Sequence, residues 1–140
     1  MASLTVQVEY SWEPVTTHGG QKYRFPEPLS PEFREEWSRP AVYRWVFRGD
    51  DGCLREALVG EAEDLARCVY QYLNPGGGQY ANAKIRQRLV DSSLSGERAE
   101  LEVLKIGSVS LNGNVLPARD LTRPAVRRLL EQALNVLGAK

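Results

Sequence analysis

The chain has 140 residues, 42% of them hydrophobic and 26% charged, which predicts one globular domain with its own core and leaves too little length for two. Its 18 basic and 18 acidic residues cancel to a net charge of zero, so an overall basic field is excluded and any nucleic-acid contact needs a local cluster. A zinc site built from Cys and His is close to excluded, because it needs three or four such ligands and the chain has one histidine and two cysteines that form no CxxC pair.

The first element is a strand in an N-terminal extension that we assign to residues 1–38. The segment LTVQVEY alternates, with Val6, Val8 and Tyr10 on one face, which is typical of a half-buried strand. Such a strand can complete the central sheet at its edge, or it can form the interface of a homo-oligomer.

The rest of the extension is rich in proline and glycine. It predicts one short strand at residues 22–25 and a short helix that begins after Ser30, with Pro31 at the first helical position.

A hairpin follows the extension. Two apolar runs, AVYRWVF at 41–47 and LREALVG at 54–60, are joined by a loop that contains Asp51-Gly52, a strong turn signal. We therefore expect two adjacent antiparallel strands, the second of which ends at Gly60 and leads directly into a helix.

That helix carries an apolar stripe. Its members recur at helical spacing: Leu65, Cys68, Val69, Tyr72 and Leu73. Arg67 lies roughly opposite the centre of the stripe, because successive residues are about 100° apart around a helix. If the stripe faces the sheet, Arg67 points to solvent.

The remaining elements are a helix at about 82–94, a strand at 99–106, a small hairpin around Asn112-Gly113 and a final helix capped by Thr122. The fold class that follows is α+β, a small mixed or antiparallel central sheet flanked by helices.

Four segments resemble the GIY-YIG nuclease superfamily. Its two signature motifs correspond to Ala41-Val42-Tyr43 and Leu58-Val59-Gly60, and the phrases GEAEDLARCVYQYL and RRLLEQAL strengthen the resemblance. It implies a GIY-YIG-like domain over residues 39–140.

The resemblance implies an endonuclease that hydrolyses DNA phosphodiester bonds with a single divalent metal, Mg²⁺ or Mn²⁺. Tyr43 corresponds to the tyrosine that activates or positions water, and Glu131 to the metal-binding glutamate. Tyr72 corresponds to a position where some members carry a polar catalytic residue. One carboxylate with water and phosphate oxygens is a reasonable Mg²⁺ site, because this ion keeps most of its water shell.

Two positions depart from the family pattern. Leu58 stands where the second motif carries a tyrosine, and Cys68 stands where the family carries a catalytic arginine. A neutral thiol cannot stabilise charge on a phosphate as a guanidinium does. The alternative is therefore a catalytically degenerate domain that binds nucleic acid or a protein partner without cleavage. Replacement of the arginine by Arg86 or Arg88 stays open.

The segment NPGGGQY and the helix after it form a candidate DNA contact. A glycine-rich loop before a helix can cradle a phosphate, and the helix offers Asn82, Lys84, Arg86 and Arg88. The ordinary interpretation is a solvated loop and helix face.

The site residues also have ordinary interpretations. Cys68 on an apolar stripe is typical of a small buried hydrophobe, and Tyr43 of a core aromatic. Glu131 follows Arg127 and Arg128 at the spacing of helix ion pairs.

The cellular setting is a separate expectation. No apolar run approaches the roughly 20 residues of a membrane span, and the first residues lack the pattern of a signal peptide. We expect a cytoplasmic protein that does not enter membranes.

Overall fold

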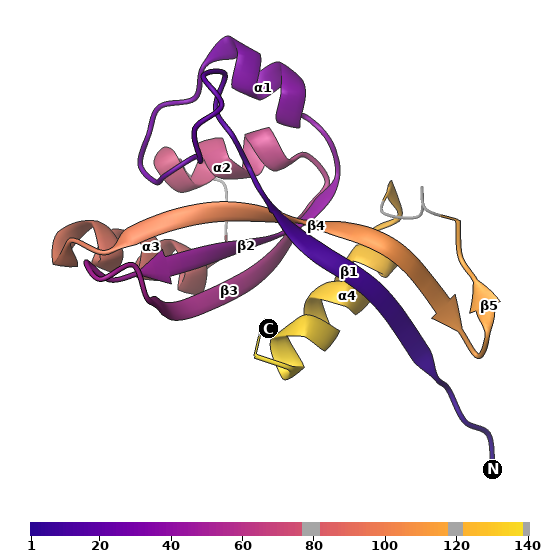
Figure 1. The fold of residues 1–140 in the computed structure, drawn as a ribbon. Helices are drawn as coiled ribbons and strands as arrows, with labels where there is room; N and C mark the ends of the chain where they lie inside the picture. The colour runs from indigo at the N-terminus through magenta and orange to yellow at the C-terminus, as the bar shows by residue number, and fades with distance from the viewer. Residues whose placement is uncertain (77–81, 118–121, 139–140) are drawn as a thin grey trace.

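A computed structural model describes residues 1–76, 82–117 and 122–138. These residues form an α+β fold, in which a five-stranded antiparallel sheet is flanked by four helices (Figure 1). The predicted fold class is confirmed, and every strand pairing is antiparallel.

The predicted hairpin forms one side of the sheet, with β3 at the edge. β2 (Ala41–Arg48) and β3 (Leu54–Ala62) pair along their lengths, and Gly52 in the turn between them has a φ of 78°. This left-handed conformation is the one a glycine adopts without strain, which explains the turn signal in the sequence. The register places Tyr43 of the first motif opposite Gly60 of the second.

The N-terminal strand completes this sheet. β4 (Arg98–Leu111) pairs with β2 on one side and with β1 (Val6–Pro14) on the other, which gives the order β1–β4–β2–β3. β1 and β4 continue together as a long arm beyond the helices, and the short β5 (Asn114–Val115) pairs with the end of β4 (Figure 1). Association of two copies through β1 stays a prediction.

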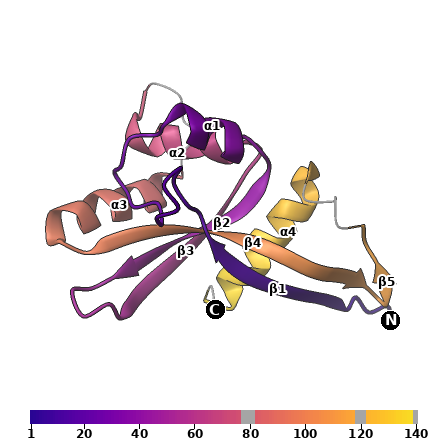
Figure 2. The same ribbon diagram turned by 45° about the horizontal axis from the view of Figure 1, so that its top comes forward.

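Helices cover both faces of the sheet. α1 (Pro31–Trp37) and α2 (Leu65–Leu73) lie together on one face, and α4 (Pro124–Val136) crosses the other face (Figures 1 and 2). α3 (Ala83–Ser95) contributes Ile85 and Leu89 to the core on the α1–α2 side. Two apolar layers result, one on each face.

The extension contributes to both layers, since apolar residues of β1 pack against the α4 side and the rest of the extension packs on the α1–α2 side. Val15, Tyr23, Phe33 and Trp37 are buried in the same cluster as Tyr43 and the α2 stripe. Residues on either side of position 39 therefore share one core.

Two local predictions within the extension can be compared with the structure. Ser30 caps α1 as predicted, since its hydroxyl accepts the Phe33 amide at 3.1 Å. The strand predicted at 22–25 is reduced to isolated bridges, in which Lys22 pairs with Thr16 and Arg24 with Glu100.

The cap predicted for the final helix is wrong. The residue before α4 is Arg123, which makes no side-chain capping hydrogen bond, and Pro124 opens the helix. Proline is favoured at that position because it lacks the N–H that would have no partner in the helix. In the part of the chain described, none of the helices has the length and apolar character that crossing a bilayer requires.

Candidate functional site

The start of α2 positions the residues that follow the second motif. Asp64 caps the helix, because its carboxylate accepts the Arg67 amide at 3.0 Å. The predicted stripe then faces the sheet, with Leu65, Cys68 and Tyr72 buried, whereas Arg67 is exposed as predicted.

Tyr43, Cys68 and Tyr72 meet in a buried cluster. The Tyr43 and Tyr72 hydroxyl oxygens are 2.6 Å apart, and the Cys68 thiol donates to the Tyr43 hydroxyl at 3.4 Å. The polar atoms of the cluster thus satisfy one another, and none of these partners is a cation.

Burial sets the protonation of this cluster. Loss of hydration raises the pKa of Tyr43 well above its usual value, and the neighbouring Cys68 and Tyr72 raise it further. Burial likewise raises the pKa of Tyr72, and it raises the pKa of the Cys68 thiol to about 11. All three groups are neutral near pH 7, so the cluster holds neither a thiolate nor a phenolate.

The close approach of the Tyr43 ring explains why position 60 is a glycine. A Cβ at position 60 would lie 2.5 Å from both Cζ and Oη of Tyr43. The two residues face each other across the β2–β3 pair. The tyrosine of the first motif and the glycine of the second are therefore linked by packing, whether or not a reaction takes place here.

The two departures from the family pattern both lie in the apolar layer. Leu58 packs against the core cluster, where a leucine side chain suits its surroundings. Cys68 is 8% exposed and fills its site as a small side chain, as its ordinary interpretation predicts.

Glu131 lies on α4, the helix that covers the opposite face of the sheet from the cluster. Burial raises the pKa of its carboxyl, the charge of Glu61 raises it further, and Arg128 opposes this. The structure therefore brings Tyr43, Cys68 and Tyr72 together and places Glu131 apart from them, on the helix across the sheet.

A groove at the edge of β3 lies between α2 and α4. It has a volume of about 240 Å³, and Cys68 borders it. Six charged residues line it: Glu61, Glu63, Asp64, Arg67, Arg127 and Arg128.

An ion pair forms part of the groove wall. Arg127, with a side chain only 2% exposed, donates to Glu61 at 2.9 Å, and the exposed Arg128 lies 3.9 Å from the same carboxylate. These residues were not among the predicted site residues. Strand alternation offered a signal for Glu61, because a residue next to Gly60 must face the side away from Tyr43.

The four predicted DNA contacts have different surroundings. The Asn82 side chain caps α3 by accepting the Lys84 and Ile85 amides at 3.0 and 3.2 Å, and Lys84 is exposed. Arg86 is partly buried, with an Nε that has no hydrogen-bond partner among the described residues. Of the glycine-rich loop before them, residues 77–81 lie outside the described part.

Arg88 is held within the fold. It pairs with Glu56 at 2.6 Å and with Glu97 at 2.8 Å, and its guanidinium lies 4.2 Å from the centre of the Phe47 ring. A guanidinium with these partners has few donors left for a ligand.

No family model, no curated protein and no solved structure matches the chain. The resemblance to the GIY-YIG superfamily accordingly stays a prediction from the sequence motifs.

Proposed function

We propose that the chain is a GIY-YIG-like domain that binds nucleic acid through backbone phosphates and does not cleave it. The main observation behind the absence of cleavage is that neighbouring side chains enclose the Tyr43 hydroxyl. It is covered by Tyr72 at 2.6 Å and by Cys68 at 3.4 Å, in a residue that is 2% exposed. A group that activates water must reach that water or the substrate within hydrogen-bonding distance.

The missing cation supports the same conclusion. The position of the expected arginine holds a neutral, buried thiol, and Arg67 beside it points to solvent. Loss of an arginine that stabilises charge on a transferring phosphate costs about 10³- to 10⁵-fold in rate. A domain that keeps the packing of the motifs but lacks this charge is suited to binding.

The six charged side chains of the groove are three arginines and three acids, so it has no net charge, but two of its arginines are exposed to a ligand. Arg67 is exposed on α2, and the Arg128 side chain on α4 is 73% exposed. Guanidinium groups contact phosphate through paired N–H donors, independently of base sequence. This supports backbone binding in preference to recognition of a sequence.

One observation favours the endonuclease as a second candidate. Glu131 and Glu61 are close enough to raise the pKa of the Glu131 carboxyl, and a divalent cation would relieve this repulsion. Among the described residues, no three His, Cys, Asp or Glu side chains gather into a metal-binding group. Glu131 would therefore hold Mg²⁺ or Mn²⁺ largely through water and phosphate oxygens, and the ion would polarise the scissile phosphate.

The experiment measures binding and cleavage in the same samples. End-labelled single-stranded and duplex DNA are incubated with the purified chain and Mg²⁺ or Mn²⁺, and binding is followed by fluorescence anisotropy at two salt concentrations. The variants are Glu131→Ala, Cys68→Arg and, as the matched control, Cys68→Ser.

Binding that weakens with salt, together with intact DNA in every sample, is the expected result. Cleavage by the wild-type chain that disappears in Glu131→Ala would establish the endonuclease instead. Cleavage by Cys68→Arg alone would show that only the cation is missing. Absence of binding at low salt would overturn the nucleic-acid proposal and leave a protein partner as the alternative.

A further inference from the structure

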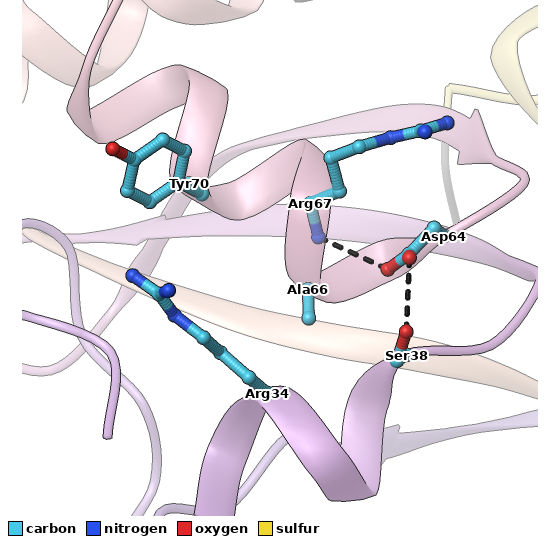
Figure 3. Close-up of a pocket in the computed structure, with 6 residues that line it drawn as sticks. All are labelled: Arg34, Ser38, Asp64, Ala66, Arg67 and Tyr70. Atoms are coloured by element: carbon cyan, nitrogen blue, oxygen red, sulfur yellow. Dashed lines mark hydrogen bonds between the residues drawn. The ribbon is translucent and has the colours of Figure 1, made fainter. Parts of the chain in front are cut away.

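A second hollow lies between the extension and the GIY-YIG-like segment. It has a volume of about 240 Å³ and is lined by α1 and its C-terminal end on one side and by the first turns of α2 on the other (Figure 3). Its lining residues are Arg34, Ser38, Asp64, Ala66, Arg67 and Tyr70. α1 lies outside the segment covered by the family resemblance.

Asp64 carries the one carboxylate among the lining residues, and both of its oxygens already accept hydrogen bonds. One oxygen of Asp64 accepts the Arg67 amide at 3.0 Å, and the other accepts the Ser38 hydroxyl at 2.9 Å (Figure 3). Within the described residues, neither the Arg34 nor the Arg67 guanidinium forms an ion pair within 4.0 Å. The groups left to contact a ligand are therefore two cations and an aromatic ring.

Arg34 and Tyr70 form a stacking surface. The guanidinium carbon of Arg34 lies 5.0 Å from the centre of the Tyr70 ring, and Tyr70 is 43% exposed. Figure 3 shows the Arg34 side chain reaching from α1 toward this ring on α2. Aromatic rings and planar guanidinium groups are the platforms on which unpaired bases stack, and cations beside them contact the phosphates.

We propose that this hollow holds one nucleotide of a single-stranded nucleic acid, with the base on Tyr70 and Arg34, while Arg67, whose side chain points away from Arg34 (Figure 3), contacts the next phosphate of the strand. The proposal rests on the proposed function and adds the form of the ligand and the site that takes it. A volume of about 240 Å³ lies below the usual range of small-molecule sites, roughly 300–1,000 Å³, which favours one unit of a polymer.

Arg67 connects this hollow to the groove at the edge of β3, because it lines both. A single strand can therefore run from the groove between α2 and α4, over the start of α2, to α1. In this arrangement the extension supplies half of the stacking site, which gives α1 a role in binding besides its contribution to the core.

The test compares single-stranded DNA, single-stranded RNA and duplex DNA of one sequence, each labelled and followed by fluorescence anisotropy. Arg34→Ala and Tyr70→Ala remove the two stacking groups. Arg39→Ala is the matched control, since Arg39 is also an exposed arginine that lies over an aromatic ring, 4.4 Å from the centre of Trp37, but it lines a different hollow. Both stacking residues are exposed, and circular dichroism checks that each variant folds.

We expect Arg34→Ala and Tyr70→Ala to weaken single-strand binding about 5- to 100-fold each, the loss measured when one stacked base is released. DNA and RNA single strands should be affected alike, and Arg39→Ala should change binding less than twofold. Arg34→Lys should keep the salt dependence of single-strand binding but lose most of the affinity, because lysine keeps the positive charge and lacks the planar guanidinium on which a base stacks.

The outcomes separate the two proposals. Single-strand binding that is intact in both stacking variants would overturn this inference and leave the proposed function standing. If the variants lost equal affinity for duplex and single-stranded DNA, the inference that an unpaired base stacks in this hollow would be overturned. Tight competition by an acidic peptide would identify a general anion surface and overturn the inference as well. No binding of any oligonucleotide by the wild-type chain would overturn both.

Discussion

Replacement of Gly60 by alanine adds one methyl group and is expected to destabilise the fold. The new Cβ would lie 2.5 Å from Cζ and Oη of Tyr43, whereas ordinary contact begins near 3.4 Å, so the two must separate by about 0.9 Å. Neither side yields easily. Gly60 lies in a paired strand, and the Tyr43 ring is buried with its hydroxyl 2.6 Å from that of Tyr72.

The magnitude follows from two costs. Overpacking of a core costs about 1–3 kcal/mol, and loss of the hydrogen bond between the tyrosines adds about 1 kcal/mol. The free energy of unfolding should therefore fall by about 2–4 kcal/mol. With an unfolding entropy of about 2.1 cal/mol/K per residue, a chain of 140 residues would lose roughly 7–14 °C in Tm.

Thermal and urea unfolding, followed by circular dichroism, measures this change. Gly19→Ala is the matched control, because a Cβ there meets no atom within 4 Å. The double variant Tyr43→Leu/Gly60→Ala removes the clashing ring, so Gly60→Ala should cost little on that background. A Gly60→Ala chain within 0.5 kcal/mol of wild type, or an equal cost on both backgrounds, would refute the reasoning.

Three further predictions concern single side chains. In the native chain an Ellman assay should find one reactive thiol, the exposed Cys53, and Cys68 should react only on unfolding. Rapid reaction of both thiols in the native chain would contradict the buried cluster. Because the pKa of Cys68 is raised to about 11 from 9.0, its contribution to stability is complete below pH 9 and is lost as pH rises toward 11, by up to about 1.4 kcal/mol per pH unit. Urea titrations at pH 8–11 would show this loss, with Cys68→Ala losing less. Arg88→Ala should lower the free energy of unfolding by about 1–3 kcal/mol and leave oligonucleotide binding unchanged, since its partners are Glu56 and Glu97.

Patterns that depend on neighbouring residues in the chain predicted the structure well. The α2 stripe, the exposure of Arg67, the turn at Asp51-Gly52 and the Ser30 cap are all confirmed, because each is determined within a few residues. The final cap was wrong by one residue, which is the usual uncertainty at a helix end.

Long-range pairings could be predicted only in part. The sequence offered β1 as an edge strand but gave no partner, since pairing with β4 joins residues about a hundred positions apart. For the same reason the Arg127–Glu61 pair, 66 residues apart, was not foreseen. Arg88 looked like a free cation because its partner Glu56 lies on a strand and not on its own helix.

The pairing of β1 with β4 has a consequence for the order in which the domain forms. β1 is made first, yet Val6 pairs with Leu111, and at about 5–20 residues per second that partner follows after roughly 5–20 s of synthesis. In the interval β1 is an unpaired strand, and the charges of Glu9 and Glu13 protect it against pairing with other chains. When the whole chain refolds, pairing of β1 with β4 still closes a longer loop than pairing of β2 with β4, so we expect β1 to gain protection last in pulsed hydrogen exchange. Early protection of β1 would contradict this order, in which β1 becomes stable only after β4 is available to pair with it.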